Sequence, residues 1–314
     1  MSHIAVLTAP DEPDLPGLQN LPADTRVEHV RDEKTLRNAL ENADVLVVTD
    51  FRSDLLQRCW PENPAIRWVH ATSAGVDALM FPALRSSDIP VTNARGIFNR
   101  GIAEYVLGAV LMFAKDTLGN LHYQRQRRWQ HRDTALVDGQ RILIVGAGSI
   151  GSTVGQLLSA VGMDVVGTAR SEREVAGFRR VYAQQHLPEL LPDADHVVIT
   201  APLTPDTEGL FDRKTLALMK PSACLINVGR GAIVRTDALL DALTRGALAG
   251  AALDVLEQEP LPTDHPLWQQ PNVMISAHMA GDFIGWRKAL GEQFMDNFKR
   301  WQAGEPLHNI VDKS

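Results

Sequence analysis

A glycine-rich turn near the middle of the 314-residue chain limits the possible folds more than any other feature. It reads Val-Gly-Ala-Gly-Ser-Ile-Gly over residues 145–151, follows the apolar run 142–145 and leads into the helix-like stretch 150–161. A strand, a GxGxxG turn and a helix in this order form the fingerprint of a dinucleotide-binding βαβ unit. The first glycine permits the tight turn, the second lets the backbone approach the pyrophosphate, and the third lets helix and strand pack closely. The expected dinucleotide contacts in this turn are Gly146, Gly148, Ser149, Ile150 and Gly151.

Short apolar runs alternate with helix-like stretches along the whole chain. In the first third they are 4–7, 45–49, 67–70 and 90–92. From residue 142 they are 142–145, 164–168, 196–200, 223–227, 250–254 and 273–276. The later runs are apolar throughout, which is typical of parallel strands covered by helices on both faces. We therefore predict an α/β protein with doubly wound parallel sheets.

The length of the chain indicates about two domains, because single cores rarely grow beyond roughly 250 to 300 residues. Helical spacing of apolar residues runs from Asn99 to Asp116, and a second helical pattern follows Gly281 and is long enough to return to the first domain. We predict one domain of residues 1–98 and 286–314, a dinucleotide-binding domain of residues 99–285, and a cleft between them.

Composition and charge favour small-molecule chemistry. The formal net charge of −7 argues against a protein that holds nucleic-acid phosphates, and no apolar stretch is long enough to cross a bilayer. The basic cluster at 125–128 is more typical of a solvated face or an oligomer arm. Cys59 and Cys224 stand in or beside apolar runs, which indicates buried reduced thiols, and nothing suggests a metal site. Residues 1–8 resemble a first strand rather than a signal peptide, so we expect a cytosolic location.

The end of the second strand of the glycine-turn domain bears on the choice of dinucleotide. About 20 residues after the turn, an acid normally holds the ribose 2′-hydroxyl of NAD. No carboxylate stands there, whereas Arg170, with Ser171 and Arg173 beside it, could hold a 2′-phosphate. The sequence thus predicts NADPH in preference to NADH. The alternative is that Arg170 is an ordinary surface arginine and that Thr168 binds the NAD ribose through its hydroxyl.

Three polar residues stand beside the carboxyl ends of predicted strands, where open α/β sheets bind ligands. They are Arg230, Glu259 and His278. A guanidinium can fork onto a carboxylate, and histidine is the side chain whose pKa suits proton transfer near neutral pH. Each also has an ordinary explanation, as a surface cation, a helix-start acid and a buried histidine with satisfied hydrogen bonds.

Several motifs together resemble those of the D-isomer-specific 2-hydroxyacid dehydrogenases, over essentially the whole chain. They are the glycine turn, Asn-Val-Gly-Arg-Gly at 227–231, Asp-Val-Leu-Glu-Gln-Glu-Pro at 254–260, Ala-His-Met-Ala-Gly at 277–281 and Ser-Ala-Gly-Val-Asp at 73–77. The resemblance implies a Rossmann-type cofactor domain and a flavodoxin-like substrate domain. It also implies NADPH-dependent reduction of a small 2-keto acid, such as glyoxylate or hydroxypyruvate, to the D-2-hydroxy acid.

The resemblance also implies roles for individual residues. Arg230 would bind the substrate carboxylate and polarise the keto oxygen, His278 would deliver the proton, and Glu259 would favour the protonated imidazole. The backbone N–H groups of Ser73, Ala74 and Gly75 would receive the carboxylate. The remaining cofactor contacts expected are Thr168, Arg170, Ser171, Ala201, Pro202, Val228, Gly229 and Asp254, the last near the nicotinamide carboxamide.

The sequence departs from the family pattern in two places, and other functions stay open. Ala277 stands where the family has a proline, and no acid ends the second strand of the glycine-turn domain. One alternative is a non-catalytic, dinucleotide-sensing protein of the corepressor type, and another is an NAD-dependent dehydrogenase of a different small acid. The family implies a homodimer, in which the segment around Trp129 could pack on a second subunit. Candidate pocket residues, each more often a packing or surface residue, are Phe51, Arg52, Phe283 and Trp286.

Overall fold

The computed structural model describes residues 2–9, 12–49 and 53–313, so the pocket candidates Phe51 and Arg52 lie outside the described residues. The chain forms two compact units. The first unit comprises Met1–Phe98 and Phe283–Ser314, and the second comprises Asn99–Asp282. Both contain a sheet whose strands pair only in parallel, which confirms the predicted α/β class.

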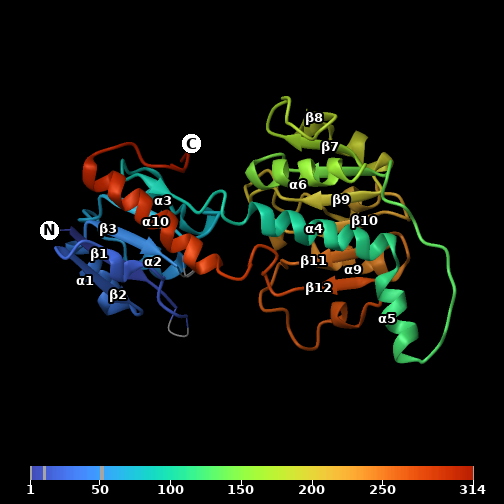
Figure 1. The fold of residues 1–314 in the computed structure, drawn as a ribbon, viewed down its shortest axis with the longest axis horizontal. Coiled ribbons are helices and arrows are strands. Elements are labelled where there is room, and N and C mark those ends of the chain that lie inside the picture. Colours follow the sequence, from blue (N-terminus) through green and yellow to red (C-terminus); the bar gives the residue numbers. More distant parts are fainter. Residues whose placement is uncertain (1, 10–11, 50–52, 314) are drawn as a thin grey trace. The chain divides into compact units, whose positions relative to one another are not determined.

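The first unit is a five-stranded sheet with the order β2-β1-β3-β4-β5. The strands are β1 (Ser2–Leu7), β2 (Thr25–Val30), β3 (Val45–Val48), β4 (Trp68–Ala71) and β5 (Val91–Thr92). Helices α1 (Glu33–Asn42) and α2 (Ser53–Cys59) bury their apolar side chains on one face of this sheet. Helix α10 (Trp286–Ala303) covers the other face (Figure 1), where Phe294 stacks on Trp68 with ring centroids 5.5 Å apart. The carboxyl-terminal helix thus packs on the sheet of the first unit.

The second unit is a seven-stranded sheet with the order β12-β11-β10-β9-β6-β7-β8. The strands are β6 (Arg141–Val145), β7 (Asp164–Ala169), β8 (Arg180–Ala183), β9 (His196–Ile199), β10 (Cys224–Asn227), β11 (Gly250–Leu253) and β12 (Val273–Ile275). Helices α4 (Asn99–Ala114) and α6 (Ser149–Ala160) lie side by side on one face (Figure 1). Helix α9 (Thr236–Thr244) packs on the other face through Leu239 and Leu243. The strand order reverses between β6 and β9, and such a switch point is where open α/β sheets bind ligands.

The shorter helices complete both units. They are α3 (Pro82–Arg85) in the first unit and α5 (Thr117–Arg125), α7 (Leu187–Leu190) and α8 (Arg213–Leu216) in the second. The helical pattern predicted for 99–116 is divided, because Asp116 takes a left-handed φ of 46° and caps α5 by accepting the Gly119 N–H. Beyond α5, residues 126–140 contain neither helix nor strand.

Two strands are not evident in the sequence, and both lie at sheet edges. Strand β2 is Thr-Arg-Val-Glu-His-Val, with two apolar residues among polar and charged ones, and β8 is Arg-Val-Tyr-Ala with an exposed first residue. An edge strand has one partner and one open side, and charged residues there discourage pairing with another chain. The continuous apolar run that marks a buried central strand is therefore absent from both.

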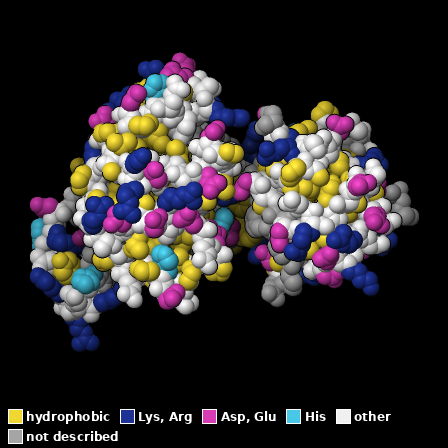
Figure 2. All heavy atoms as spheres, turned by 180° about the vertical axis from the view of Figure 1, so that it is seen from behind, with side chains coloured by type: hydrophobic (Ala, Val, Ile, Leu, Met, Phe, Trp, Pro, Cys, Tyr) yellow, Lys and Arg dark blue, Asp and Glu magenta, His cyan; other side chains and the backbone are white. Residues whose placement is uncertain are grey.

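The described surface is mixed in character. On the face drawn in Figure 2, basic and acidic side chains are interspersed, with apolar patches between them. Cys59 and Cys224 are both free and buried, as predicted. In the described part of the chain, no helix has the length and apolar character that a membrane crossing requires. Nor do the described residues bring together three His, Cys, Asp or Glu side chains in an arrangement that could hold a metal.

Candidate active site

The glycine turn joins β6 to α6, and two of its three glycines are required by close packing. Gly146 has a φ of 104°, and a Cβ atom there would lie 2.6 Å from the backbone nitrogen of Ala201. A Cβ on Gly151 would overlap the carbonyl oxygen of Gly146. A Cβ on Gly148, in contrast, would meet nothing within 4 Å. Two of the glycines thus permit close packing, while Gly148 keeps open the space above the turn.

The amino terminus of α6 is suited to an anion. Gly148 is the N-cap residue, and no side chain caps the helix. The first N–H groups of a helix have no partner within it, and together with the helix dipole they attract negative charge. The Ser149 backbone and hydroxyl accept hydrogen bonds from the Asn99 side chain, which hold the start of the helix in place. These residues fit the pyrophosphate of a dinucleotide.

The end of β7 contains the residues predicted to distinguish the two dinucleotides. Thr168 is fully buried, its hydroxyl donates to Gln184, and its carbonyl accepts the N–H groups of Gly146 and Ala147. Thr168 therefore shapes the turn, and its direct contact with a dinucleotide stays a prediction. Arg170 and Ser171 are exposed.

Arg173, also beyond β7, contacts the glycine turn directly. Its guanidinium donates to the carbonyl of Ala147 at 2.7 Å. This bond ties the β7–β8 connection to the turn.

The loops after β9 and β10 pack beside the same turn. Thr200 donates from its hydroxyl to the carbonyl of Gly146 at 2.7 Å. A Cβ on Gly229 would lie 2.9 Å from the carbonyl oxygen of Ala201, so only glycine lets these two loops approach so closely. Of the other predicted contacts, Ala201 and Val228 are buried and Pro202 is exposed.

Arg230 is positioned by the backbone of its own loop. The Asn227 side chain accepts the Gly229 N–H and donates to the Arg230 carbonyl, both at 3.1 Å. A Cβ on Gly231 would overlap the backbone of Leu256, so this loop packs tightly against the one that carries Glu259. The Arg230 side chain donates to the Gly229 carbonyl at 2.9 Å.

Glu259 and His278 form a hydrogen-bonded pair in which Nδ1 of the imidazole lies 2.8 Å from Oε2 of the carboxylate. The other oxygen of Glu259 accepts the Leu256 N–H at 2.9 Å. The bond to Glu259 raises the pKa of His278, against burial and the charge of Arg230, and the charge of Asp254 adds to the rise. Burial acts to raise the pKa of Glu259, but the bonds from His278 and Leu256 and the charge of Arg230 lower it overall. The pair therefore favours the charged forms of both groups, an imidazolium beside a carboxylate.

The loop that carries His278 is held by Asp254. His278 has a φ of 51°, a left-handed conformation that costs about 1 to 3 kcal/mol outside glycine and needs support from its surroundings. The Asp254 carbonyl accepts the His278 N–H at 2.8 Å, and its carboxylate accepts the N–H groups of Met279 and Ala280 at 2.8 and 2.9 Å. Asp254, only 4% exposed, is thus a structural support in addition to its predicted place near the nicotinamide.

Sequence reasoning did not single out three residues that hold these loops. Thr200 follows β9, Ser276 follows β12, and Tyr105 lies within α4. A polar residue directly after an apolar strand is the signal that could have pointed to the first two. Tyr105 reaches Ser276 across 171 positions of sequence, and no local pattern marks it.

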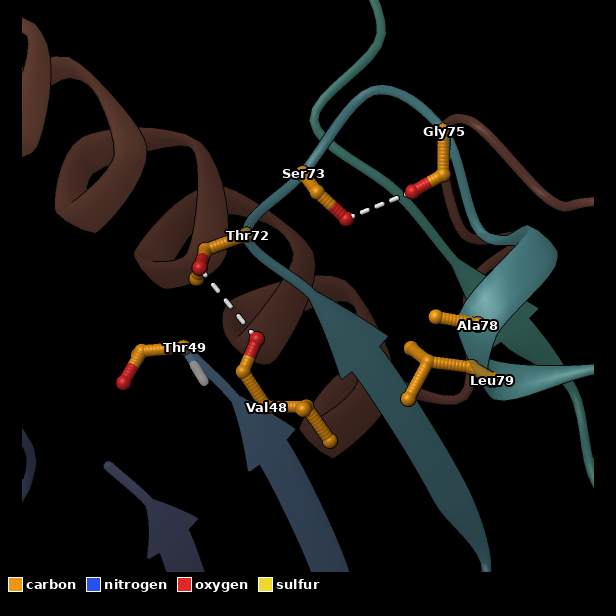
Figure 3. Close-up of a pocket in the computed structure, with 7 residues that line it drawn as sticks. All are labelled: Val48, Thr49, Thr72, Ser73, Gly75, Ala78 and Leu79. Atoms are coloured by element: carbon orange, nitrogen blue, oxygen red, sulfur yellow. Dashed lines mark hydrogen bonds between the residues drawn. The ribbon is translucent and has the colours of Figure 1, made fainter. Parts of the chain in front are cut away.

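In the first unit, the loop after β4 presents backbone N–H groups. The carbonyls of Ser73, Ala74 and Gly75 accept hydrogen bonds from Ala94 N–H, the Asn93 amide and the Ser73 hydroxyl, respectively. No hydrogen bond from the N–H groups of residues 73–76 is found within the described residues. A run of such N–H groups forms a concave site for an anion. The loop borders a small pocket (Figure 3), lined by Val48, Thr49, Thr72, Ser73, Gly75, Ala78 and Leu79.

The two aromatic pocket candidates of the first unit differ in surroundings. Trp286 begins α10 and packs on the apolar cluster of this unit, with its ring centroid 6.0 Å from that of Phe98. Phe283 is 40% exposed. Trp286 therefore has a packing role whether or not it also contacts a ligand.

The chain matches the family model of the NAD-binding domain of D-isomer-specific 2-hydroxyacid dehydrogenases over residues 107–280. It is 32% identical over 292 residues to a glyoxylate reductase from Aeropyrum pernix, covering 89% of this chain and 86% of the relative. It is 32% identical over 253 residues to glyoxylate/hydroxypyruvate reductase A from Serratia proteamaculans, covering 79% and 80%. The protein therefore belongs to the D-isomer-specific 2-hydroxyacid dehydrogenase family.

Solved structures agree with this assignment. An NADPH-dependent glyoxylate/hydroxypyruvate reductase from Sinorhizobium meliloti, in complex with NADP and sulfate, superposes with a TM-score of 0.87 at 27% identity, covering 100% of this chain and 99% of that one. The protein is an NAD(P)-dependent 2-hydroxyacid dehydrogenase, and its cofactor is a nicotinamide dinucleotide.

Proposed function

We propose that this enzyme reduces a small 2-keto acid, such as glyoxylate or hydroxypyruvate, to the D-2-hydroxy acid, with NADPH preferred over NADH. The observation that carries the proposal is the bond of 2.8 Å between His278 and Glu259, with the charge of Arg230 acting on both groups. A proton donor and a carboxylate-binding cation thus stand in one loop cluster. In this proposal residues 99–285 bind the dinucleotide, and residues 1–98 with 286–314 bind the substrate.

The dinucleotide, His278 and Glu259 have separate roles in the proposed reaction. The bound dinucleotide supplies the hydride that reaches the carbonyl carbon. Since Glu259 engages Nδ1 of His278, we assign Nε2 as the nitrogen that donates a proton to the keto oxygen. Glu259 holds the imidazole in orientation and favours its protonated form.

Each unit is assigned a group that can bind a carboxylate. Arg230 can fork onto its oxygens and draw electron density from the adjacent keto group. The backbone N–H groups of residues 73–75 can bind an anion through their dipoles, without a charged side chain. Support comes from the carbonyls of this loop, which are all engaged internally while its N–H groups are not.

A spectrophotometric screen tests the reaction. Glyoxylate, hydroxypyruvate, pyruvate and larger 2-keto acids are offered with each reduced dinucleotide, and consumption of the dinucleotide is followed by absorbance. We expect turnover of at least one two- or three-carbon keto acid and a D-configured product. Absence of turnover with every keto acid would favour a non-catalytic dinucleotide sensor and overturn the proposal.

The preference for NADPH rests on Arg170. Its side chain is exposed directly after β7, and it has no ion pair or hydrogen bond among the described residues, so it is available to a 2′-phosphate. The Arg170→Ala variant should lower kcat/KM for NADPH roughly 10- to 100-fold and leave NADH nearly unchanged. Arg179→Ala, an exposed arginine of the same connection, is the control. A preference for NADH in the unmodified enzyme contradicts this part of the proposal.

We further propose a homodimer formed through α5 and the segment 126–140. Trp129 is fully exposed, and Leu136 and Leu121 are 74% and 42% exposed on this arm, which extends away from the sheet of its own unit in Figure 1. Large exposed apolar side chains along one segment are typical of a surface that a second subunit covers. Light scattering should give twice the chain mass, and Trp129→Asp should shift the enzyme toward the monomer.

A further inference from the structure

Helix α4 contacts the loop of His278 at two points one helical turn apart. Gly101 and Tyr105 are four residues apart and so lie on the same face of the helix. A Cβ on Gly101 would lie 2.8 Å from the carbonyl oxygen of Gly281, so the helix backbone rests directly on the end of the loop. The Tyr105 hydroxyl lies 2.7 Å from the hydroxyl of Ser276, at the start of the loop.

The hydroxyl of Ser276 links Tyr105 to Asp254 by hydrogen bonds. Ser276 donates to Oδ1 of Asp254 at 2.5 Å. Because a serine hydroxyl has a single proton, Tyr105 is then the donor in its bond with Ser276. Burial raises the pKa of Tyr105, and the charge of Asp254 adds to this, so the phenol keeps its proton at neutral pH. The result is a directed chain from Tyr105 through Ser276 to the carboxylate of Asp254.

The same carboxylate fixes the two residues that follow His278. Its oxygens accept the N–H groups of Met279 and Ala280, while the backbone of Asp254 accepts the N–H of His278 itself. The carboxylate accepts the Ser276 hydroxyl and the Met279 N–H at Oδ1 and the Ala280 N–H at Oδ2, so it cannot rotate without losing these bonds. The left-handed conformation of His278 is thus supported from α4 through two side chains.

We infer that Tyr105 and Ser276 are positioning residues for the proton donor: they orient the carboxylate of Asp254, which holds the His278 loop in the conformation that reaches the substrate. Neither residue touches the reacting atoms in this scheme. The inference rests on the proposed role of His278, and it assigns to α4 a part in proton delivery.

The test compares Tyr105→Phe and Ser276→Ala with Ser276→Thr, which keeps the hydroxyl. Tyr123→Phe and Ser222→Ala serve as controls, because neither contacts the loop. For the first two variants we expect kcat to fall about tenfold, since a small misplacement of a catalytic group has effects of this size or larger. KM for the dinucleotide and the melting temperature should stay near those of the unmodified enzyme, and Ser276→Thr should recover most of kcat.

Hydrogen exchange of the Met279 and Ala280 amides gives a readout that does not depend on turnover. Both amides should exchange faster in Tyr105→Phe and Ser276→Ala, and at the unmodified rate in the two controls. The inference is overturned if Tyr105→Phe and Ser276→Ala leave both kcat and the exchange of these amides unchanged. It is also overturned if kcat falls only together with the melting temperature. If His278→Gln keeps its turnover, the proposed function fails instead, and the exchange rates still decide whether Tyr105 orders the loop.

Discussion

The two units contribute different chemistry at corresponding places in their sheets. In the second unit, the loops after β10, β11 and β12 present titratable side chains, with Glu259 and His278 bonded at 2.8 Å. In the first unit, the loop after β4 presents the backbone N–H groups of residues 73–76, and the side chains of Ser73 and Asn93 engage carbonyls of this loop. In the proposed function, the second unit acts through the identity of its side chains and the first through the conformation of its backbone.

This difference decides how each unit should respond to mutation. Replacing a titratable group removes its chemistry outright, whereas replacing a side chain that only shapes a loop leaves the peptide dipoles in place. Single substitutions should therefore have large effects in the second unit and small effects in the first.

His278→Gln should have the largest effect. The amide of glutamine can occupy similar space but cannot transfer a proton, and general acid catalysis contributes about 10²- to 10⁴-fold. We expect kcat for the preferred keto acid to fall by about a thousandfold, while the dissociation constant of NADPH, measured by fluorescence, stays nearly constant. His186→Gln, at another histidine of the second unit that bonds to a glutamate, should behave like the unmodified enzyme. Retention of a substantial part of kcat would show that His278 is not the donor.

The glycine turn provides a pair of variants that separate packing from binding. A Cβ on Gly151 overlaps the Gly146 carbonyl, so Gly151→Ala should cost about 1 to 3 kcal/mol of unfolding free energy and weaken dinucleotide binding. In Gly148→Ala the new methyl group contacts no protein atom, so the melting temperature should stay unchanged. The methyl group should instead contact the pyrophosphate and weaken NADPH binding by roughly tenfold or more. If Gly148→Ala binds NADPH as tightly as the unmodified enzyme, the pyrophosphate does not occupy the space above the turn.

Glu259→Gln should change the pH dependence of reduction. The bond to Glu259 is the main cause of the raised pKa of His278, so a neutral partner lowers that pKa. In the proposed mechanism reduction requires the protonated imidazole, so activity should decline as the pH rises through the pKa of His278. In the variant this decline should occur at lower pH than in the unmodified enzyme, and kcat at low pH should be less affected than kcat at high pH. The measurement is kcat against pH, with Glu257→Gln as the neighbouring control, and an unmoved decline contradicts the pairing.

The sequence predicted the α/β class and the central strands because buried parallel strands are apolar throughout, as in Val45–Val48 and residues 142–145. It also predicted the polar residues at their ends. It did not predict β2 and β8, whose one open side permits polar residues, nor the bond between Tyr105 and Ser276. That bond joins a helix to a strand end far away in sequence, and only the packed structure brings the two hydroxyls together.

Ser73→Ala should give the smallest effect and the sharpest test of the contrast between the units. It removes the hydroxyl that donates to the Gly75 carbonyl at 2.7 Å, but it leaves the N–H groups of the loop unaltered. The net value of one such bond, about 0.5 to 1.5 kcal/mol, corresponds to a rise in KM for the keto acid of roughly two- to tenfold. Because the proton donor is untouched, kcat should stay constant. A loss of kcat as large as that of His278→Gln would mean that the Ser73 hydroxyl takes part in the chemistry, and the first unit would then act through residue identity as well.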